Sequence, residues 1–472
     1  MSEEARRREV LVVGAGISGL AAAYALSTAG LDVELLERSE RVGGSIRTVR
    51  ESGYLYELGP NTLARRDAAL WKLIGELGLE GEVHYAAPES RNRYIVRGGR
   101  LLALPQGPGE FLRTPLLSWF GKLRLLGDLA QLRGADPDES VAAFMRRRLG
   151  REAMEYVVDP FVRGIYAGDP ERLLIRTAFP ILYGWEREAG SLLVGALRAY
   201  RRQAARRSGE VPPPSPLYGF RDGLSVLPER LAEALSGRIY LRTRLERFFP
   251  LPEGGFEAFL IREGQAERVC TRYLVLAVPS FEAASLVRFL DGETARRLEE
   301  IEYAPLAVVY TAFRQEDVPR ALDGFGFLCP SREGRFVLGS LWSSTLFPGR
   351  TPAGQLALTA MVGGATRPER AFLSDAALLD GVLRDYRELL GINAQPVFVR
   401  IHRWERAIPQ YTGRHAEALE AIERMERTFP GLYLLGSYRQ GVSVGACVAQ
   451  GLNLARRLLD ASRQEHAAPV GG

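Results

Sequence analysis

The chain has 472 residues, of which 46% are hydrophobic and 25% are charged, and its formal net charge is +5. This composition is typical of a globular protein, and the length exceeds what one hydrophobic core usually serves, so we expect two or three domains. The three cysteines, Cys270, Cys329 and Cys447, lie far apart without a CxxC spacing. Their spacing argues against a disulfide framework, a zinc site and a redox dithiol, and it favours a reducing compartment.

The charge pattern narrows the possible partners. The basic excess is nearly all arginine, because Lys72 and Lys122 are the only lysines. The runs Arg146–Arg148 and Arg201–Arg207 lack interleaved aromatic residues, so we interpret them as solvated helix faces and expect no nucleic acid partner. From the charged start Met1–Glu9 we expect no secretory signal, and no uninterrupted apolar run is long enough to span a bilayer. We therefore expect a cytoplasmic protein, either soluble or peripheral on the inner face of the cell membrane.

A strand, a glycine-rich turn and a helix follow this start. Val10–Val13 predicts a buried strand, Gly14–Gly19 has the spacing Gly-x-Gly-x-x-Gly, and Leu20–Leu26 predicts a helix. A second apolar strand, Val33–Leu36, leads into Glu37, whose carboxylate is placed to accept the ribose hydroxyls of a nucleotide. Because the glycines lie between a strand and a helix, the motif predicts a dinucleotide site and not merely a structural turn.

The glycines point to a long cofactor. Gly14 allows the sharp turn, Gly16 lets the backbone approach a pyrophosphate at the helix's positive end, and Gly19 lets the helix pack on the strand. Arg41–Arg47 forms a second glycine-rich turn, and Tyr54–Thr62 runs a strand into a third turn. Two close-approach turns near one nucleotide suit FAD better than NAD. No second Gly-x-Gly-x-x-Gly follows, so we expect the reducing electrons to come from the substrate.

The segment from about 90 to 210 has a helical pattern. Within Pro115–Arg133, apolar residues recur at helical spacing, and we interpret this stripe as core-facing, with a membrane surface as the alternative. The proline-rich stretch Val211–Pro216 predicts a stiff connector at the end of the segment. The stripe consists of Leu116, Trp119, Phe120, Leu123 and Leu126, and Lys122, Arg124 and Asp128 lie off it.

The chain then returns to the first domain. Gly223–Leu235 predicts a helix, and Ile239–Phe249, Gly255–Arg262 and Arg268–Val278 predict strands. Tyr273–Pro279 is nearly all apolar, which is typical of a parallel strand buried on both faces.

A second sheet and a further strand-turn-helix unit complete the chain. We expect the later strands to form a substrate domain, and the final unit to bring another helix N-terminus to the cofactor. The second-sheet strands are predicted at Leu306–Phe313, Arg335–Leu341 and Gln355–Val362; the final unit consists of the strand Leu432–Ser437, the turn Gly441–Gly445 and a helix from Ala446 to about Leu459.

These patterns together predict an α/β fold with three parts. A discontinuous Rossmann-type FAD-binding domain consists of residues 1–85, 217–280 and 401–472. A helical domain occupies residues 86–216, and a mixed-sheet substrate domain occupies residues 281–400.

Side-chain chemistry for catalysis is scarce. The four histidines, His84, His402, His415 and His466, show neither metal-ligand spacing nor a triad pattern, so we interpret them as structural or surface residues. No pair of carboxylates suggests acid–base work either. We therefore expect no metal and no catalytic side chain, because a flavin performs hydride abstraction itself and the protein needs only to orient the substrate.

More specific motifs lie downstream, and in chain order they are Asn92–Tyr94, Arg163–Asp169, Asp323–Phe327, Ile408–Tyr411 and Gly441–Cys447. With Gly14–Gly19, Glu37, Arg41–Gly44 and Glu57–Asn61 they resemble the protoporphyrinogen oxidase family, and the resemblance covers nearly the whole chain. The early motifs alone indicate only the broader amine oxidase-like flavoprotein superfamily. The chain departs from the family at Gly445-Ala446, where a polar pair usually precedes the cysteine.

The resemblance implies a non-covalent FAD enzyme of heme biosynthesis. Such an enzyme oxidises protoporphyrinogen IX to protoporphyrin IX with O2, giving H2O2, and removes six electrons as three hydrides. A coproporphyrinogen III oxidase that forms coproporphyrin III is the alternative substrate assignment. An amine oxidase or carotenoid desaturase is disfavoured because no lysine follows Lys122. A non-catalytic flavin-binding scaffold is the alternative from another class, and a homodimer and the metal chelatase that takes the product remain open as partners.

The resemblance also implies which residues form the site. Without the resemblance, the apolar residues among them would be interpreted as core of the second sheet, and Trp404 as a buried aromatic residue without a cofactor contact. The substrate-binding residues it implies are Arg93, a propionate anchor, and Gly164, Phe325, Leu328, Leu341 and Met361. The cofactor-binding residues it implies are Gly14, Ala15, Gly16, Ile17, Ser18, Gly19, Glu37, Arg38, Gly44, Ser45, Gly59, Pro60, Asn61, Thr62, Leu245, Trp404, Val442, Ser443 and Val444.

Overall fold

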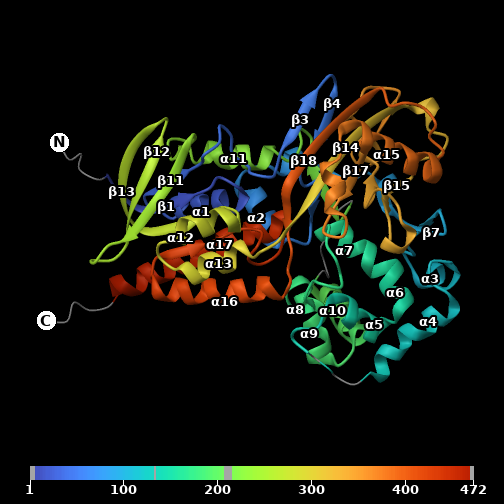
Figure 1. Ribbon diagram of the computed structural model, residues 1–472, viewed down its shortest axis with the longest axis horizontal. Coiled ribbons are helices and arrows are strands. Elements are labelled where there is room, and N and C mark those ends of the chain that lie inside the picture. The colour runs from blue at the N-terminus through green and yellow to red at the C-terminus, as the bar shows by residue number, and fades with distance from the viewer. Residues whose placement is uncertain (1–5, 132–133, 135, 207–214, 468–472) are drawn as a thin grey trace.

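The computed structural model describes residues 6–131, 134, 136–206 and 215–467. Figure 1 shows one sheet with its helices on the left, a second sheet at the upper right and a group of helices below the second sheet. Two seven-stranded sheets form the two halves, and a two-stranded and a three-stranded sheet accompany them. The two small sheets contain β3 (Thr48–Glu51) with β4 (Tyr54–Glu57), and β5 (Leu63–Ala64), β9 (Leu217–Phe220) and β6 (Val83–Tyr85).

The first sheet has a parallel centre. Its strand order is β10-β2-β1-β13-β12-β11, and β19 also pairs with β13. The strands β10, β2, β1, β13 and β19 run parallel, so their carboxyl ends share one edge. The predicted strand Ile239–Phe249 is two strands in the structure. The bounds are β1 Arg6–Val13, β2 Val33–Leu36, β10 Ile239–Tyr240, β11 Thr243–Pro250, β12 Phe256–Arg262, β13 Gln265–Leu276 and β19 Leu432–Leu434.

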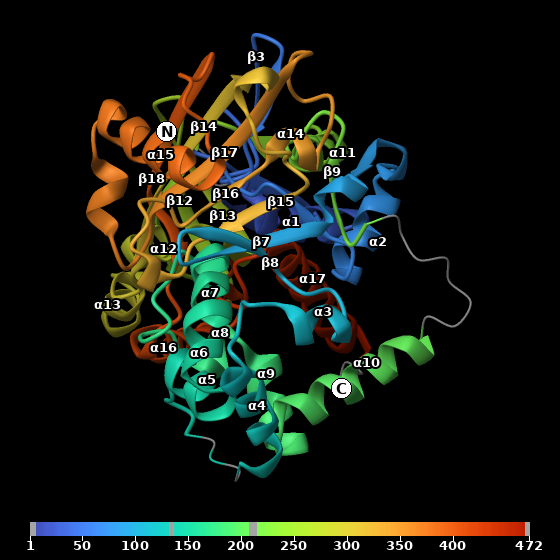
Figure 2. The same cartoon turned by 90° about the vertical axis from the view of Figure 1, so that its right-hand side faces the viewer.

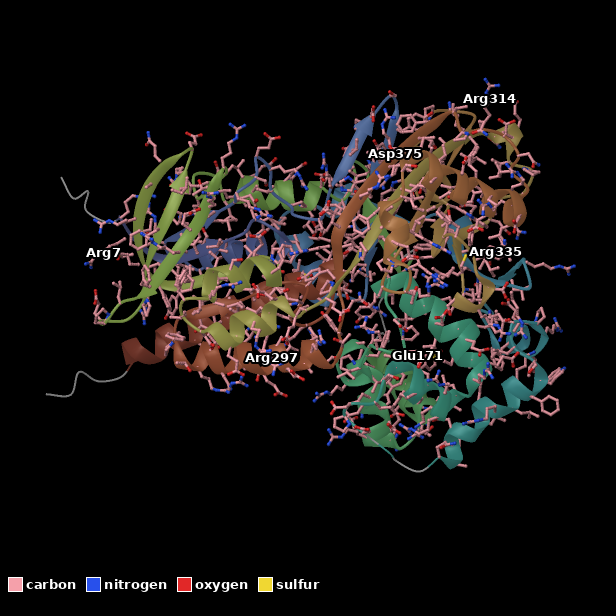
Figure 3. All side chains as sticks on the ribbon, viewed as in Figure 1. Arg7, Glu171, Arg297, Arg314, Arg335 and Asp375 are labelled. Carbon is pink, nitrogen blue, oxygen red and sulfur yellow. The ribbon has the colours of Figure 1, made fainter. Side chains whose placement is uncertain are left out.

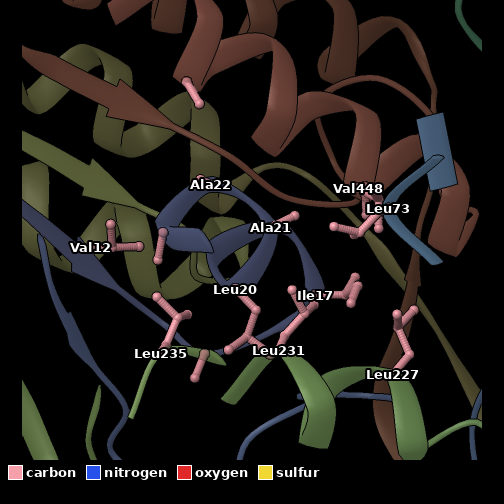
Figure 4. Packing of buried hydrophobic residues seen from close by; sticks show 14 of the residues in the cluster. Val12, Ile17, Leu20, Ala21, Ala22, Leu73, Leu227, Leu231, Leu235 and Val448 are labelled. Carbon is pink, nitrogen blue, oxygen red and sulfur yellow. The ribbon is translucent and has the colours of Figure 1, made fainter. Parts of the chain in front are cut away.

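Helices from distant parts of the chain cover this sheet. Figure 4 shows Leu20 and Ala21 of α1 among side chains of α2, α11 and α17. The packing is close because Gly451 of α17 has no side chain: a Cβ there would lie 2.5 Å from the carbonyl oxygen of Ser18. The helices of this part are α1 Ile17–Thr28, α2 Ala68–Glu76, α11 Val226–Ala234, α12 Ser280–Val287, α13 Gly292–Glu299, α16 Gly413–Thr428 and α17 Val444–Ala467.

The second sheet is mixed and has the order β18-β14-β17-β16-β15-β7-β8. Residues 92–103, predicted to be helical, form its edge hairpin, so that prediction is wrong there. The predicted domain limits divide this sheet. Strands β7 and β8 lie in the predicted helical domain 86–216, and β18, which pairs with β14, extends into the predicted FAD-binding segment 401–472. The bounds are β7 Asn92–Arg97, β8 Arg100–Ala103, β14 Tyr303–Arg314, β15 Gly324–Leu328, β16 Gly339–Leu341, β17 Gln355–Gly363 and β18 Phe398–Pro409, with α14 at Ser343–Leu346 and α15 at Asp375–Leu390.

The helical part lies below the second sheet, with α7 directly under it (Figure 2). Its core includes Phe144, Met154 and Val162, together with Tyr411 from outside the helical part. The predicted connector Val211–Pro216 lies mostly outside the described residues. The helices are α3 Pro108–Arg113, α4 Trp119–Leu126, α5 Val141–Leu149, α6 Arg151–Ala153, α7 Asp159–Tyr166, α8 Ile175–Ala178, α9 Pro180–Ala189 and α10 Leu192–Arg206.

The apolar stripe of residues 116–126 faces outward. Trp119 is 65% exposed, Phe120 85% and Leu123 62%, so the core-facing interpretation is wrong for these residues, and only Leu116 of the stripe is buried. The opposite side of α4 packs inward, where Lys122 Nζ donates hydrogen bonds of 2.8 Å to two backbone carbonyls. No helix within the described residues is long and apolar enough to cross a membrane.

The arginine run of α5 is not a uniformly solvated face. Arg148 is fully buried with Glu186 and Asp128, and its Nε donates to Glu186 at 2.8 Å. Only Arg146 is exposed, where it pairs with Glu171, which is labelled in Figure 3. A charge buried in this way is stable only because it is paired and hydrogen-bonded. The solvated-face prediction is therefore wrong for Arg148.

We predict that Arg148→Met destabilises the protein by about 3–5 kcal/mol, because Asp128 and Glu186 would remain buried without this partner. Urea unfolding followed by circular dichroism measures the change. Arg146→Met is the matched control on the same helix, and it should cost less than about 1 kcal/mol because its ion pair is exposed to solvent. Equal losses in the two variants would contradict the interpretation.

Candidate functional site

The site begins at the shared carboxyl edge of the first sheet. Gly14, after β1, has φ +104°, and a Cβ there would lie 2.5 Å from the carbonyl oxygen of Ala277. A Cβ on Gly19 would lie 2.0 Å from the carbonyl oxygen of Gly14. The turn and the first turn of α1 therefore require glycine at both positions. At Gly16, by contrast, a Cβ would meet nothing within 4 Å, so this position faces open space.

The carboxylate of Glu37 lies over this turn. Its Oε2 accepts a hydrogen bond from the backbone N–H of Ala15 at 2.9 Å. Its Oε1 accepts from the N–H and the hydroxyl of Ser39 at 2.9 and 2.8 Å. The acid predicted from the spacing after the glycine motif is therefore next to the motif in space.

The second glycine-rich turn is joined to the first. The N–H of Gly43 donates to the carbonyl oxygen of Ala15 at 2.8 Å. The guanidinium of Arg41 donates to the carbonyl oxygens of Val42, Gly44 and Ile46 at 3.1, 2.6 and 3.3 Å, which holds the turn from within. The third turn approaches it as well: a Cβ on Gly59 would lie 1.9 Å from the carbonyl oxygen of Ser45. The segments that contain Gly44, Ser45, Gly59, Pro60, Asn61 and Thr62 therefore converge.

This backbone fits an extended dinucleotide. Three turns from distant parts of the first 62 residues meet where open space faces Gly16. No side chain caps the N-terminus of α1, so its first amides remain available to an anion such as a pyrophosphate. Within the described residues, no three His, Cys, Asp or Glu side chains gather as a metal site.

Two of the predicted cofactor residues have other environments. Arg38 is exposed and pairs with Glu282 at 2.6 Å, so its guanidinium is directed toward α12. The side chain of Leu245 is buried in the same core cluster as Leu36. Contact of either residue with a nucleotide remains a prediction.

Trp404 connects the nucleotide edge to the second sheet. Its indole Nε1 donates to the carbonyl oxygen of Leu58 at 2.7 Å. Its ring belongs to the same apolar cluster as Met361 and Leu306. One side chain thus joins the third turn to the apolar cluster that contains Met361, a residue predicted to bind substrate.

The predicted substrate residues lie on neighbouring strands of the second sheet, except Gly164 on α7. Leu328 packs directly on Gly164, where a Cβ would lie 2.9 Å from Leu328 Cδ2. Leu341 of β16 is paired with Gly326 of β15, and Met361 of β17 is paired with Gly339 of β16. The structure therefore brings these residues together along adjacent strands.

Arg93 supplies a cation at the end of this arrangement. It pairs with Gly326 in the sheet, and its Cζ lies 5.2 Å from the ring centroid of Phe325. Partial desolvation, and then the nearby charge of Arg66, lowers the pKa of the Arg93 guanidinium. Two positive charges thus gather beside an aromatic ring, which suits an anionic group on an apolar ligand. Arg66 was not predicted, because only the fold brings it near Arg93.

Sequence reasoning also missed a contact of the C-terminal loop. Tyr411, which the sequence analysis used only as part of a family motif, donates its hydroxyl hydrogen to the carbonyl oxygen of Ser437 at 2.5 Å. The same hydroxyl oxygen accepts from the N–H of Gly441 at 2.8 Å. His415, predicted to be structural or on the surface, is buried beneath it, and burial lowers its pKa to about 4.

The chain matches the flavin containing amine oxidoreductase family over residues 17–459. It is 33% identical to protoporphyrinogen oxidase 2, chloroplastic/mitochondrial, of Arabidopsis thaliana, over 95% of this chain and 93% of the relative. It is 34% identical to protoporphyrinogen oxidase of Bos taurus (96% and 98%), and 27% identical to coproporphyrinogen III oxidase of Bacillus subtilis (strain 168) (94% and 96%). The crystal structure of a putative protoporphyrinogen oxidase from Exiguobacterium sp. 255-15 superposes with a TM-score of 0.79 at 27% identity, covering 97% of this chain and 99% of that one.

The chain belongs to the flavin-containing amine oxidoreductases and, within them, to the protoporphyrinogen oxidase family. It is therefore a flavoprotein oxidoreductase whose cofactor is FAD, as the fold and the converging turns also indicate. The predicted α/β fold with a Rossmann-type nucleotide domain and a mixed second sheet is confirmed.

We predict that Gly16→Val abolishes FAD binding while the protein still folds. A Cβ there would meet no protein atom within 4 Å, so the added side chain would extend into the space that faces the cofactor. The flavin absorbance of the purified protein measures the effect. Gly292→Val is the matched control, since Gly292 also lies at a helix N-terminus with nothing within 4 Å of an added Cβ, but it belongs to none of the three turns. A Gly16→Val protein that retains full flavin would refute this placement.

Proposed function

We propose that the protein oxidises protoporphyrinogen IX to protoporphyrin IX with O2 as acceptor, giving H2O2. Bound FAD would supply hydride acceptance and the transfer of electrons to O2. The observation that carries the proposal is the pairing of a cation, Arg93, with the ring of Phe325 at the end of an apolar sheet face. The names of the relatives support the choice of a porphyrinogen.

In this proposal the chain orients the substrate. The guanidinium of Arg93 binds a propionate as a fork, and Arg66 adds positive charge beside it. Phe325, Leu328, Leu341 and Met361 provide apolar surface for the macrocycle, and the backbone of Gly164 faces it. Trp404 holds the sheet against the turn at Leu58, which keeps the substrate face next to the cofactor. Six electrons leave as three hydrides together with three protons; the protons pass to solvent and are balanced by those taken up when O2 becomes H2O2, so no side chain is assigned as a general acid or base.

The predicted cofactor contacts belong to the same proposal. The first turn, with Gly14, Ala15, Gly16, Ile17, Ser18 and Gly19, binds the pyrophosphate, and Glu37 binds a ribose. Gly44, Ser45 and Gly59–Thr62 line the path toward the ring, with Val442, Ser443 and Val444 opposite.

Coproporphyrinogen III is the second candidate substrate, favoured by the relative from Bacillus subtilis. It carries two more propionates than protoporphyrinogen IX, whereas Arg93 is the one cation among the predicted substrate-binding residues, with the charge of Arg66 near it. Purified protein is incubated with each porphyrinogen, and porphyrin fluorescence and H2O2 are followed. We expect the higher kcat/KM for protoporphyrinogen IX. A clear preference for coproporphyrinogen III would overturn the choice, and no turnover of either would favour a flavin-binding scaffold.

We predict that Arg93→Ala raises KM roughly 10- to 150-fold with little change in kcat. This range corresponds to the loss of a charge-assisted hydrogen bond worth about 1.5–3 kcal/mol. Steady-state kinetics on protoporphyrinogen IX measure it. Arg100→Ala, an exposed arginine on the neighbouring strand of the same hairpin, is the control and should behave as the parent protein. Unchanged kinetics for Arg93→Ala would remove Arg93 from the site.

We also propose that the protein is peripheral on the inner face of the cell membrane. The exposed apolar side chains of α4 gather with Leu112, and a groove of about 540 Å³ between Pro105 and Leu112 adjoins them. The exposed Leu197 and Tyr200 of α10 lie on a helix that also carries the exposed Arg201 and Arg202. Apolar side chains with basic flanks are typical of a helix that lies in a membrane interface. A homodimer and contact with a product-accepting metal chelatase stay predictions.

We predict that Phe120→Glu weakens binding to anionic liposomes at least about tenfold, because the side chain would no longer enter the lipid. Co-sedimentation at low and high salt measures it. Phe289→Glu is the matched control, since Phe120 and Phe289 are both 85% exposed but Phe289 lies on the nucleotide half. If the parent protein binds at neither salt concentration, the membrane proposal fails.

A further inference from the structure

Tyr411 is the second residue of the two-residue link between Pro409, the end of β18, and Thr412, the N-cap of α16. It is 1% exposed, and both hydrogen-bonding functions of its hydroxyl are used by one loop. The hydroxyl donates to Ser437 and accepts from Gly441, so it joins two backbone positions four residues apart. A buried phenol with both functions satisfied fixes the groups that it contacts.

His415 supports Tyr411 from below. The two rings are stacked, with centroids 4.1 Å apart and an interplanar angle of 5°. His415 Nε2 lies 2.6 Å from the carbonyl oxygen of Tyr438, to which the neutral ring donates. The pair Tyr411–His415 thus holds three backbone groups of the segment Ser437–Gly441.

Within the loop the N–H of Arg439 donates to the carbonyl oxygen of Gly436 at 2.9 Å, but the loop's hydrogen bonds to the side chain of Gln450 on α17 are longer. Gly436 N–H donates to Gln450 Oε1 at 3.4 Å, and Gln450 Nε2 donates to the carbonyl oxygen of Gln440 at 3.3 Å. Gly441 has φ +92°, so the chain turns sharply there before α17 begins at Val444. Hydrogen bonds of 3.3 to 3.4 Å constrain such a turn weakly compared with those to the phenol.

The loop also faces the cofactor edge. It follows β19, whose carboxyl end lies beside those of β1 and β13. Its helix α17 contacts the first turn of α1 through Gly451 and Ser18. Val444 belongs to the same buried cluster as Ile17 of α1, and Val442 packs against the core of the helical part.

Tyr411 is itself held from the other side. Its carbonyl oxygen accepts from the N–H of Leu174 at 2.8 Å, and the neighbouring Gln410 Nε2 donates to the carbonyl oxygen of Tyr166 at 2.9 Å. The residue thus lies between the helical part and the cofactor loop. Because the backbone of Tyr411 is held by these hydrogen bonds, its phenol can hold the loop in a fixed position.

We infer that Tyr411 is a positioning residue that fixes the loop 437–444 against the flavin, with His415 as its support. The inference rests on the proposed contact of Val442–Val444 with FAD. Backbone groups held near a flavin ring set its affinity and its reduction potential. Loss of the phenol hydroxyl should therefore change the bound flavin and not only the stability of the fold.

The test compares Tyr411→Phe with Tyr166→Phe in the full-length holoprotein. Both remove one hydroxyl from a buried ring in the same cluster, with ring centroids 5.6 Å apart, but the hydroxyl of Tyr166 donates to Ala178, away from the loop. FAD affinity is measured by titration of the flavin-free protein, with the visible flavin spectrum and the midpoint potential as further readouts. We expect Tyr411→Phe to bind FAD roughly tenfold more weakly, with a shifted spectrum and potential. Tyr166→Phe should stay within about twofold of the parent.

Unchanged affinity, spectrum and potential in Tyr411→Phe would overturn the inference, and so would equal changes in Tyr166→Phe. If Tyr411→Phe does not fold, His415→Phe replaces it: the ring stack stays while the bond to Tyr438 is lost, and an unchanged flavin again overturns the inference. These readouts need FAD but no porphyrinogen. A protein that oxidises no porphyrinogen therefore contradicts the proposed function without deciding the role of Tyr411.

Discussion

The contact between Gly14 and Ala277 is the constraint on which the rest of the structure depends. At this point the ends of β1 and β13 approach so closely that a single added carbon would lie 2.5 Å from a carbonyl oxygen. The two strands come from opposite ends of a long excursion of the chain, which contains the helical part and the edge hairpin of the second sheet. The glycine turn therefore does more than admit a cofactor. It also lets β1 and β13 pair at the centre of the parallel sheet, and Glu37, the second and third turns and the loop before α17 lie along the carboxyl edge of that sheet.

Function follows from how the second sheet is attached to this edge. The indole of Trp404 reaches from β18 to the backbone of Leu58, and Tyr411, just beyond the same strand, reaches to the loop before α17. The substrate face and the cofactor edge are thus connected through one strand and its continuation. Because the cofactor of a flavoenzyme carries out the redox chemistry, the protein needs rigid placement of substrate and cofactor more than it needs acidic or basic side chains.

Local patterns were predictable, and contacts between distant segments were not. The strand-turn-helix unit of residues 10–26 was predicted correctly, and Glu37 does lie next to its turn, because every determinant lies within a few dozen residues. The hairpin of residues 92–103 was missed because it joins the second sheet through the pairing of β7 with β15, a strand from a distant part of the chain. The outward orientation of Trp119 and Phe120 was missed because periodicity shows that apolar residues share a face but not what covers that face. Arg148 looked solvated because its partners Asp128 and Glu186 lie 20 and 38 residues away.

In the proposed reaction the macrocycle delivers its electrons directly to the bound FAD. An anaerobic titration of the holoprotein with protoporphyrinogen IX, followed by flavin absorbance and porphyrin fluorescence together, tests this claim most directly. Direct transfer predicts that one porphyrin forms for every three flavins bleached, since six electrons leave in pairs. A flavin that stays oxidised, or porphyrin that forms without bleaching, would contradict it.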